Sequence, residues 1–102
     1  EMINVMNELH KILVINNIKI SLAVYPWPQQ LKYDQQNSKH VQMWKNFCNE
    51  KCFKFIDFFP YFFDEKNKTS FLNVYKKYYF WNDVHFNERG NKIIAERLIK
   101  EF

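Results

Sequence analysis

The sequence predicts an α/β fold with parallel strands. Two short segments, residues 18–25 and 52–58, have the β-branched and aromatic composition of buried strands. A helical pattern of about 14 residues separates them, and a strand, a helix and a second strand in this order form a crossover unit with parallel strands. Amphipathic helical patterns at residues 2–15 and 91–102 flank this unit, so helices are expected to cover the sheet.

The composition is that of one small folded domain. The chain has 102 residues, of which 47% are hydrophobic and 20% aromatic, and only one is glycine. This much apolar surface excludes a disordered chain or a low-complexity linker. The net charge of +4 comes from scattered lysines, which favour a solvated surface over a nucleic-acid interface. The longest apolar patch, residues 53–63, is interrupted by charges and falls far short of the ~20 residues of a membrane-spanning helix.

The first helix is expected to end at a clear stop. Its apolar side chains recur at helical spacing, and Asn16 and Asn17 then supply residues that tolerate a left-handed cap. The helical pattern is already running at residue 2 with no cap before it, so a further portion of the domain is expected to precede residue 1. The apolar positions are Met2, Val5, Met6, Leu9, Ile12 and Leu13.

Residues 18–25 are expected to form a strand that is buried on both faces. Pro26 and Pro28 end this strand, because proline cannot donate to a ladder and restricts its neighbour. The loop at residues 26–36 therefore begins at the carboxyl end of a strand, where ligands bind in open α/β sheets. Trp27 is a candidate substrate-binding residue there, and a lid over the core is an equal alternative.

Asn37 or Ser38 can cap the next helix, whose inner stripe comprises core-packing residues at helical spacing. Cys48, in this stripe, and Cys52 lie four residues apart, on one face and within conceivable bridging distance. A disulfide would indicate an oxidising compartment, whereas two buried free thiols are an equally good interpretation. A metal site is the weakest alternative, because no standard ligand spacing is present. The stripe comprises Val41, Trp44, Phe47 and Cys48.

The segment from residue 59 to residue 80 is harder to assign. Pro60 interrupts it, residues 64–70 have the composition of a polar turn region, and a short helix is expected at residues 70–77. Asn67 opens an Asn-Lys-Thr glycosylation tripeptide, which has meaning only in a secreted eukaryotic protein. The four consecutive aromatics at residues 78–81 are expected to seat a loop on the core.

The last helix is expected to begin after Asn87, whose side chain can accept a backbone N–H. Glu88 suits the first turn through the helix dipole. Gly90 lies in the same turn, where its helix propensity is poor by ~1 kcal/mol, so a glycine there indicates close backbone packing. Residues Ile94, Ala95, Leu98, Ile99 and Phe102 are expected to form the buried face.

Asp83 and His85 are the candidate catalytic residues. Histidine is the natural general base near neutral pH, and a carboxylate can accept its ring N–H, fix its tautomer and stabilise the imidazolium. At positions i and i+2 of a loop, both side chains can reach one pocket. The spacing alone is weak evidence, because structural Asp and His residues are common.

The surroundings of this pair carry a family resemblance. Residues 80–95 read Phe-Trp-Asn-Asp-Val-His-Phe-Asn-Glu-Arg-Gly-Asn-Lys-Ile-Ile-Ala. This segment resembles the C-terminal catalytic block of the SGNH (GDSL-type) hydrolases and related O-acetyltransferases, and Asp83, His85, Asn87 and Gly90 match the block. Residues 22–31 and 55–59 are similar to two earlier strands of such domains.

The resemblance implies a flavodoxin-like three-layer α/β/α sandwich with parallel strands, of which residues 1–102 would be one partial, C-terminal domain. It also implies a Ser-His-Asp triad that acts on ester bonds, in a small-molecule or a carbohydrate ester, with no metal and no organic cofactor. The Gly-Asp-Ser block and the oxyanion blocks are absent, and Ser21, Ser38 and Ser70 have no nucleophile context. The missing serine is therefore expected from an upstream half of the same domain, and the chain alone is expected to be inert.

Two other classes of function stay open at this point. The aromatic side chains of Tyr25, Trp27, Tyr33 and residues 78–81 are compatible with a non-catalytic carbohydrate-binding module, and an inactive scaffold is a further alternative. Relatives of this type are often extracytoplasmic or membrane-associated, but the residues themselves assign no compartment. They do not specify the acyl group or its acceptor either.

Overall fold

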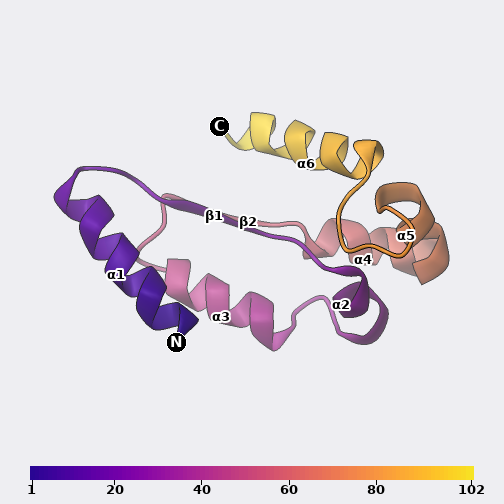
Figure 1. Cartoon of the computed structure of the whole chain (residues 1–102), viewed down its shortest axis with the longest axis horizontal. Helices are drawn as coiled ribbons and strands as arrows, with labels where there is room; N and C mark the ends of the chain where they lie inside the picture. The colour runs from indigo at the N-terminus through magenta and orange to yellow at the C-terminus, as the bar shows by residue number, and fades with distance from the viewer. The chain divides into compact units, whose positions relative to one another are not determined.

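A computed structural model describes all 102 residues, with six helices and two strands (Figure 1). The chain divides into two compact units. Unit 1 comprises Glu1–Val24 and Asn37–Asp57, and unit 2 comprises Tyr25–Gln36 and Phe58–Phe102. The protein is thus a mixed α/β chain, as predicted, with its sheet in unit 1 and most of its helices in unit 2.

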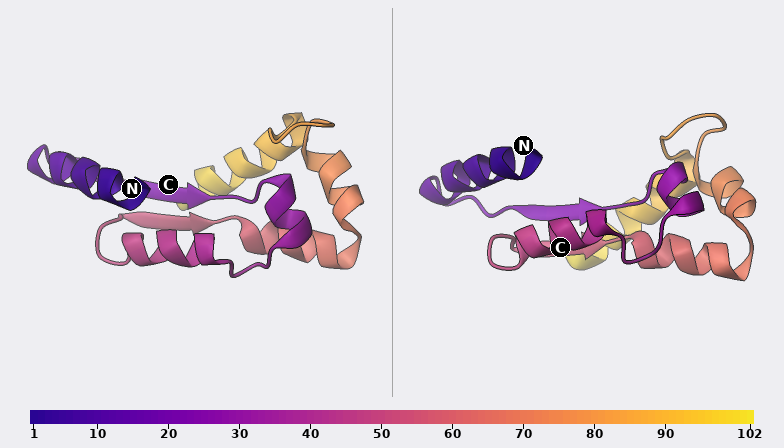
Figure 2. Two further views of the ribbon diagram at one scale, coloured as in Figure 1. Left: turned by 60° about the horizontal axis from the view of Figure 1, so that its bottom comes forward. Right: turned by 90° about the horizontal axis from the view of Figure 1, so that it is seen from below.

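The sheet of unit 1 is small and parallel. Strand β1 (Ser21–Val24) pairs with β2 (Lys54–Asp57), with Ser21 opposite Lys54 and Val24 opposite Asp57. Helix α3 (Lys39–Cys48) connects the strands and packs along both of them (Figure 2). The predicted crossover unit with parallel strands is therefore confirmed.

Local capping explains where α3 begins. The Ser38 hydroxyl accepts a hydrogen bond from the Val41 N–H at 3.2 Å, and Ser38 is fully buried. The predicted stripe of α3 is confirmed as core, because all four of its residues are buried. At the other end of the helix, Cys48 and Cys52 form a disulfide, with their Cα atoms 4.6 Å apart. Of the two main alternatives for these cysteines, a disulfide or two free thiols, the structure has the disulfide.

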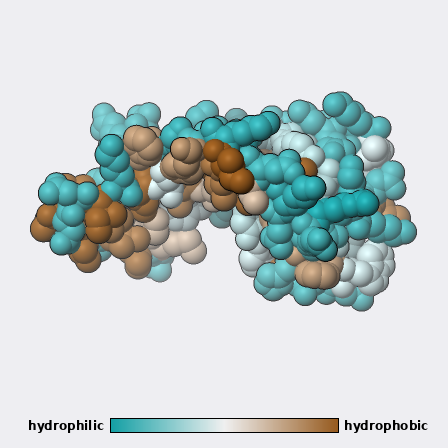
Figure 3. Space-filling model, turned by 90° about the horizontal axis from the view of Figure 1, so that it is seen from above, coloured by the Kyte–Doolittle hydropathy of each residue, from teal (hydrophilic) through white to brown (hydrophobic).

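Helix α1 (Met2–Ile15) ends where the two asparagines predicted a stop. Asn17 has a φ of 58°, in the left-handed region, and the Asn16 side-chain amide donates to the Ile12 carbonyl at 2.8 Å. No residue of α1 is fully buried, and Met2, Val5 and Ile12 are more than half exposed. In Figure 3, hydrophobic side chains, drawn in brown, gather on one part of the surface that this view shows.

Unit 2 contains α2 (Pro28–Tyr33), α4 (Phe59–Lys68), α5 (Phe71–Tyr78) and α6 (Glu88–Glu101). Its core is aromatic, and the fully buried Phe62 of α4 lies at the centre of it. The Phe62 ring contacts Tyr78 and Phe86 at centroid distances of 5.4 Å each, and Tyr79 at 6.2 Å. Helix α4 therefore supports the segment that follows α5.

Two prolines begin helices where the sequence predicted irregular structure. Residues 26–36 are not simply a loop, because Pro28 lies in the first turn of α2. Pro60 likewise lies in the first turn of α4, and the helix runs through most of the segment that was predicted to be a polar turn. Proline is tolerated in a first turn because the N–H that it lacks has no helical partner there. The actual turn is confined to Thr69 and Ser70, and Ser70 caps α5 close to its predicted start.

The predicted burial of the outer elements is wrong in two places. Strand β1 is half-buried rather than buried on both faces, because only Val24 is buried and Ala23 is exposed. Of the face predicted to be buried at the C-terminus, Ile99 and Phe102 are 77% and 69% exposed, and Ala95 is exposed. Ile94 and Leu98 are half-buried, and only Gly90 of α6 is buried. The helical spacing placed these residues on one stripe, but spacing alone does not show which element covers a stripe.

None of the helices combines the length and the apolar character that crossing a lipid bilayer would require.

A candidate Asp–His catalytic site

The loop that carries Asp83 and His85 is closed by its own backbone. Tyr79 and Phe86 form an isolated antiparallel bridge. The Phe80 N–H donates to the His85 carbonyl at 3.0 Å, and the Asn87 N–H donates to the Tyr78 carbonyl at 2.9 Å. These bonds bring the end of α5 and the start of α6 together, so the intervening residues form a compact loop.

Asn87 connects the base of this loop to both helices. Its side-chain oxygen accepts from the Gly90 N–H at 3.0 Å and so caps α6, as predicted. Its side-chain amide donates to the carbonyls of Lys77 at 3.0 Å and Tyr79 at 3.4 Å. One side chain therefore fixes the last turn of α5 against the first turn of α6.

Gly90 allows these two turns to approach each other. A Cβ atom at this position would clash with the backbone carbonyl oxygen of Tyr78. It would also lie 2.6 Å from Cδ1 and 2.8 Å from Cβ of Phe86, closer than real Cβ contacts. The close packing predicted for Gly90 is thus confirmed, and it lies at the base of the loop that carries Asp83 and His85.

The structure brings the two candidate catalytic side chains together. His85 Nδ1 lies 2.7 Å from Asp83 Oδ1, a short hydrogen bond. The same oxygen accepts from the Val84 N–H at 2.6 Å and from the His85 N–H at 3.3 Å. Asn82 precedes the pair with a φ of 59°, in the left-handed region that asparagine tolerates, which turns the chain toward this arrangement.

Tyr75 of α5 holds the backbone of Asp83 and was not identified from the sequence. Its hydroxyl accepts from the Asp83 N–H at 3.1 Å and donates to the Asp83 carbonyl at 3.3 Å. Its ring contacts Phe71, Tyr79 and Trp81 at centroid distances of 5.4 to 5.8 Å. The i, i+4 spacing of Phe71, Tyr75 and Tyr79 was the available signal, but it indicated an aromatic stripe rather than a contact with Asp83.

Hydrogen bonding lowers the pKa of Asp83 below its usual range. The main cause is the bond from His85, followed by the bond from the Val84 N–H, since both favour the charged carboxylate. Asp83 is therefore ionised at neutral pH and can accept a hydrogen bond from the Nδ1–H of His85. This leaves Nε2 of the ring as the acceptor for a substrate or nucleophile proton.

His85 presents its ring to solvent, with 78% of its side chain exposed. None of the three serines supplies a hydroxyl to it. The Ser38 and Ser70 hydroxyls cap α3 and α5, and Ser21 lies in β1. No three His, Cys, Asp or Glu side chains form a group that could hold a metal ion. What the chain itself assembles is an oriented imidazole without a nucleophile.

The structure connects the segment around Trp27 to the loop that carries Asp83 and His85, but not through the indole. The Tyr79 hydroxyl donates to the Pro26 carbonyl at 2.6 Å, and the Tyr25 ring lies 5.0 Å from the Phe86 ring. Trp27 itself is 52% exposed and makes no ring contact or hydrogen bond with Asp83 or His85. Its neighbours are thus fixed beside the loop, while the indole faces solvent.

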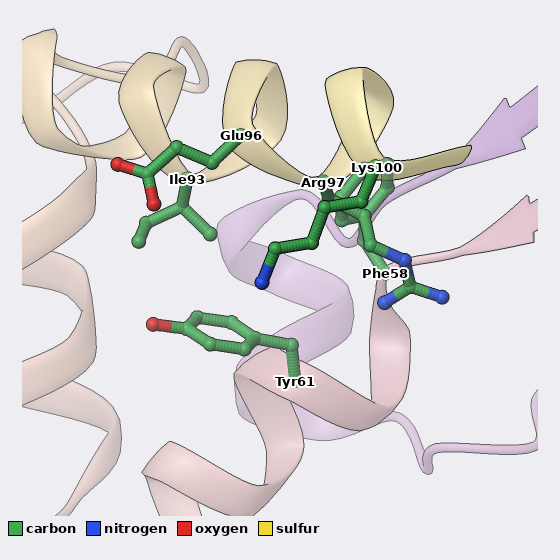
Figure 4. Close-up of a pocket in the computed structure, with 6 residues that line it drawn as sticks. All are labelled: Phe58, Tyr61, Ile93, Glu96, Arg97 and Lys100. Atoms are coloured by element: carbon green, nitrogen blue, oxygen red, sulfur yellow. The ribbon is translucent and has the colours of Figure 1, made fainter. Parts of the chain in front are cut away.

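Unit 2 also contains a cavity that lies away from Asp83 and His85. A cavity of about 240 Å³ opens between α4 and α6, and neither Asp83 nor His85 lines it. Figure 4 shows Lys100 extending toward the Tyr61 ring, and the Arg97 guanidinium lies 5.7 Å from the centre of the Phe58 ring. The cavity and the Asp–His pair are therefore separate features.

Comparisons with known proteins identify no relative. No protein-family model matches the chain, and neither a curated protein nor a solved structure matches it significantly.

Proposed function

We propose that the chain provides the Asp–His part of a Ser-His-Asp triad in an SGNH-type serine esterase or O-acyltransferase. The observation that carries this proposal is the 2.7 Å hydrogen bond between His85 Nδ1 and Asp83 Oδ1. A carboxylate in this position fixes the tautomer and stabilises the imidazolium that forms during acyl transfer.

In this proposal His85 acts as the general base. While its Nδ1–H donates a hydrogen bond to the Asp83 carboxylate, Nε2 accepts the proton of a serine hydroxyl as that oxygen attacks the ester carbonyl. His85 then returns the proton to the leaving alcohol, and water or a second hydroxyl releases the acyl group. Because the three serines of this chain are placed in a strand or at helix caps, the nucleophile is assigned to polypeptide outside these 102 residues.

The fold in this proposal is the three-layer sandwich of that family. Two features support it. The strands β1 and β2 are parallel, and parallel sheets normally have more strands and helices on both faces. In addition, the exposed apolar side chains of α1 and α6 are those of helices that cover a larger sheet. Further strands, together with the serine, would complete both the sheet and the site.

Hydrolysis of an aryl acetate by the full-length protein tests the proposal. We expect His85→Ala to lower kcat by about 10⁶-fold and Asp83→Asn to lower it by about 10⁴-fold, as in other triads. His40→Ala and Asp64→Asn are matched controls, because both residues are exposed and lie outside the loop. These two variants should keep the wild-type rate.

Two results would contradict the proposal in different ways. A full-length protein that keeps its activity after His85→Ala does not use this histidine as its base. Hydrolysis by the isolated 102-residue chain, abolished by His85→Ala, would instead show that the nucleophile lies within the chain. The assignment of the serine to another segment would then be wrong.

A carbohydrate-binding module is the second candidate, favoured by the exposure of Trp27 (52%) and Trp81 (62%). Exposed indole rings are suited to stacking against sugar rings. If binding is the function, Asp83→Asn should leave the affinity for the sugar unchanged, while Trp27→Ala and Trp81→Ala should weaken it. Titration of the protein with oligosaccharides, followed by tryptophan fluorescence, distinguishes the two candidates.

A further inference from the structure

Asn67 lies at an exposed junction between two helices of unit 2. It belongs to the last turn of α4, and the chain leaves that helix at Thr69 before α5 begins. Asn67, Lys68 and Thr69 are all exposed. The tripeptide Asn67-Lys68-Thr69 is the only Asn-x-Ser/Thr acceptor sequence in the chain.

The Asn67 side chain has no structural task. Its carboxamide makes no hydrogen bond, whereas the amide of Asn87 serves the backbone of two helices. A substituent on the Asn67 amide nitrogen would therefore displace no contact of the fold and would project into solvent. This contrast between two asparagines of the same unit marks Asn67 as a position that can accept a bulky polar group.

A second, independent feature concerns the compartment. Cys48 and Cys52 are joined in a disulfide, and no free cysteine remains in the chain. Disulfides form and persist in secretory and extracellular compartments and are rare in the cytosol. Asparagine-linked glycosylation belongs to the same route. The acceptor tripeptide and the disulfide therefore point to one environment from two separate parts of the chain.

We propose that Asn67 is a site of N-linked glycosylation. In this reaction the Asn67 amide nitrogen forms a bond to C1 of an oligosaccharide, while the bond from C1 to a lipid-linked pyrophosphate breaks. The pyrophosphate leaves with the electron pair, and the amide nitrogen loses one proton. The co-reactant is thus a lipid-pyrophosphate oligosaccharide, and the proposal is independent of the esterase assignment.

The folded geometry also sets the timing of the modification. The Thr69 hydroxyl, which the acceptor sequence requires, donates to the Glu65 carbonyl at 2.8 Å, and the Thr69 N–H donates to the same oxygen at 3.0 Å. Both groups are occupied once α4 has formed. Transfer therefore takes place on the nascent chain, before this turn closes.

Mass spectrometry of the protein from its native host tests the proposal. The chymotryptic peptide of residues 64–71 should carry an oligosaccharide that a peptide N-glycosidase removes, converting Asn67 to aspartate. Asn67→Gln and Thr69→Ala should abolish the mass increase, and Thr69→Ser should keep it, because serine retains the acceptor hydroxyl. The same digest should contain Cys48 and Cys52 as a disulfide.

Three outcomes would overturn the proposal. The first is an unmodified peptide from the native protein, and the second is a glycan that persists after Thr69→Ala. The third is the recovery of Cys48 and Cys52 as reduced thiols, which would remove the argument for an oxidising compartment. For the timing, folded unmodified protein should be a poorer acceptor for the oligosaccharyltransferase than a free peptide of residues 64–72, and equal acceptance would contradict it.

Discussion

Replacing Gly90 with alanine sets two opposing effects against each other. Alanine favours a helix over glycine by about 1 kcal/mol, so propensity alone predicts a more stable protein. The added Cβ would clash with the Tyr78 carbonyl oxygen and lie 2.6 and 2.8 Å from two Phe86 atoms. Overpacking of this kind typically costs about 1–3 kcal/mol, and the cost should lie high in that range because a backbone carbonyl cannot swing away.

We therefore expect Gly90→Ala to reduce the free energy of unfolding by about 1–2 kcal/mol. For a urea m-value of roughly 1–3 kcal/mol/M, the unfolding midpoint should fall by about 0.3–2 M. The loop should loosen together with the fold, so exchange of the Asn87 amide hydrogen, which bonds to the Tyr78 carbonyl, should accelerate by about 5–30-fold.

Asn91→Ala is the matched control, because Asn91 is the next residue of α6 and is exposed. This variant should gain a few tenths of a kcal/mol from propensity alone. If Gly90→Ala is as stable as the wild type or more stable, the close approach of α5 and α6 at this point is wrong. The account of how the loop that carries Asp83 and His85 is supported would then fail with it.

Three further changes have expected outcomes. Asn87→Ala should lower the free energy of unfolding in urea by about 0.5–2 kcal/mol, because α6 loses its cap. Asn87→Ser should recover part of that loss, since serine also caps. If the alanine and serine variants are equally stable, a capping role is excluded. Reduction of the Cys48–Cys52 disulfide should lower stability by about 2 kcal/mol, the loop-closure value for a ring of about five residues, and a Tm unchanged by dithiothreitol would contradict this. Burial, the main cause, raises the pKa of both Tyr78 and Tyr79 above the usual 10.0, so the unfolded state loses these protons first. The free energy of unfolding should therefore fall above pH 10, by up to about 1.4 kcal/mol per pH unit for each tyrosine. Tyr79→Phe should roughly halve this dependence of stability on pH. An unchanged dependence would show that Tyr79 does not contribute to it.

Features with a local cause could be predicted from the sequence. The stop at Asn16 and Asn17 and the caps at Ser38, Ser70 and Asn87 depend on a side chain and a backbone group a few residues apart. The parallel pairing of the strands also followed, because a strand, a helix and a strand have few ways to connect.

The two errors about prolines have one common cause. Pro28 and Pro60 were interpreted as breaks, although each lies in the first turn of a helix. A sequence shows that proline cannot lie inside a helix, but not which side of it the helix occupies. Helix α4 was therefore missed, together with Phe62 and its support of Phe86.

Burial of α6 could not be predicted, because periodicity identifies a stripe and not the layer that covers it. For Asp83 and His85, too, the sequence predicted one contact and missed another. The two-residue spacing allowed Asp83 and His85 to meet, and they do. The contact from Tyr75 was missed because it comes from eight residues earlier, across a turn whose path the sequence does not specify.

The local closure of the loop that carries Asp83 and His85 has a consequence for how a complete triad of the proposed kind could arise. Every hydrogen bond that orients His85 or fixes Asp83 comes from residues 75–87, a span short enough for the cost of loop closure to be small. The hydrogen bonds of the Asp–His pair are thus local, while the Phe62 ring of α4 and the bond to the Pro26 carbonyl hold the loop from outside it. A nucleophile from another segment would therefore meet an imidazole that the residues of this loop already orient.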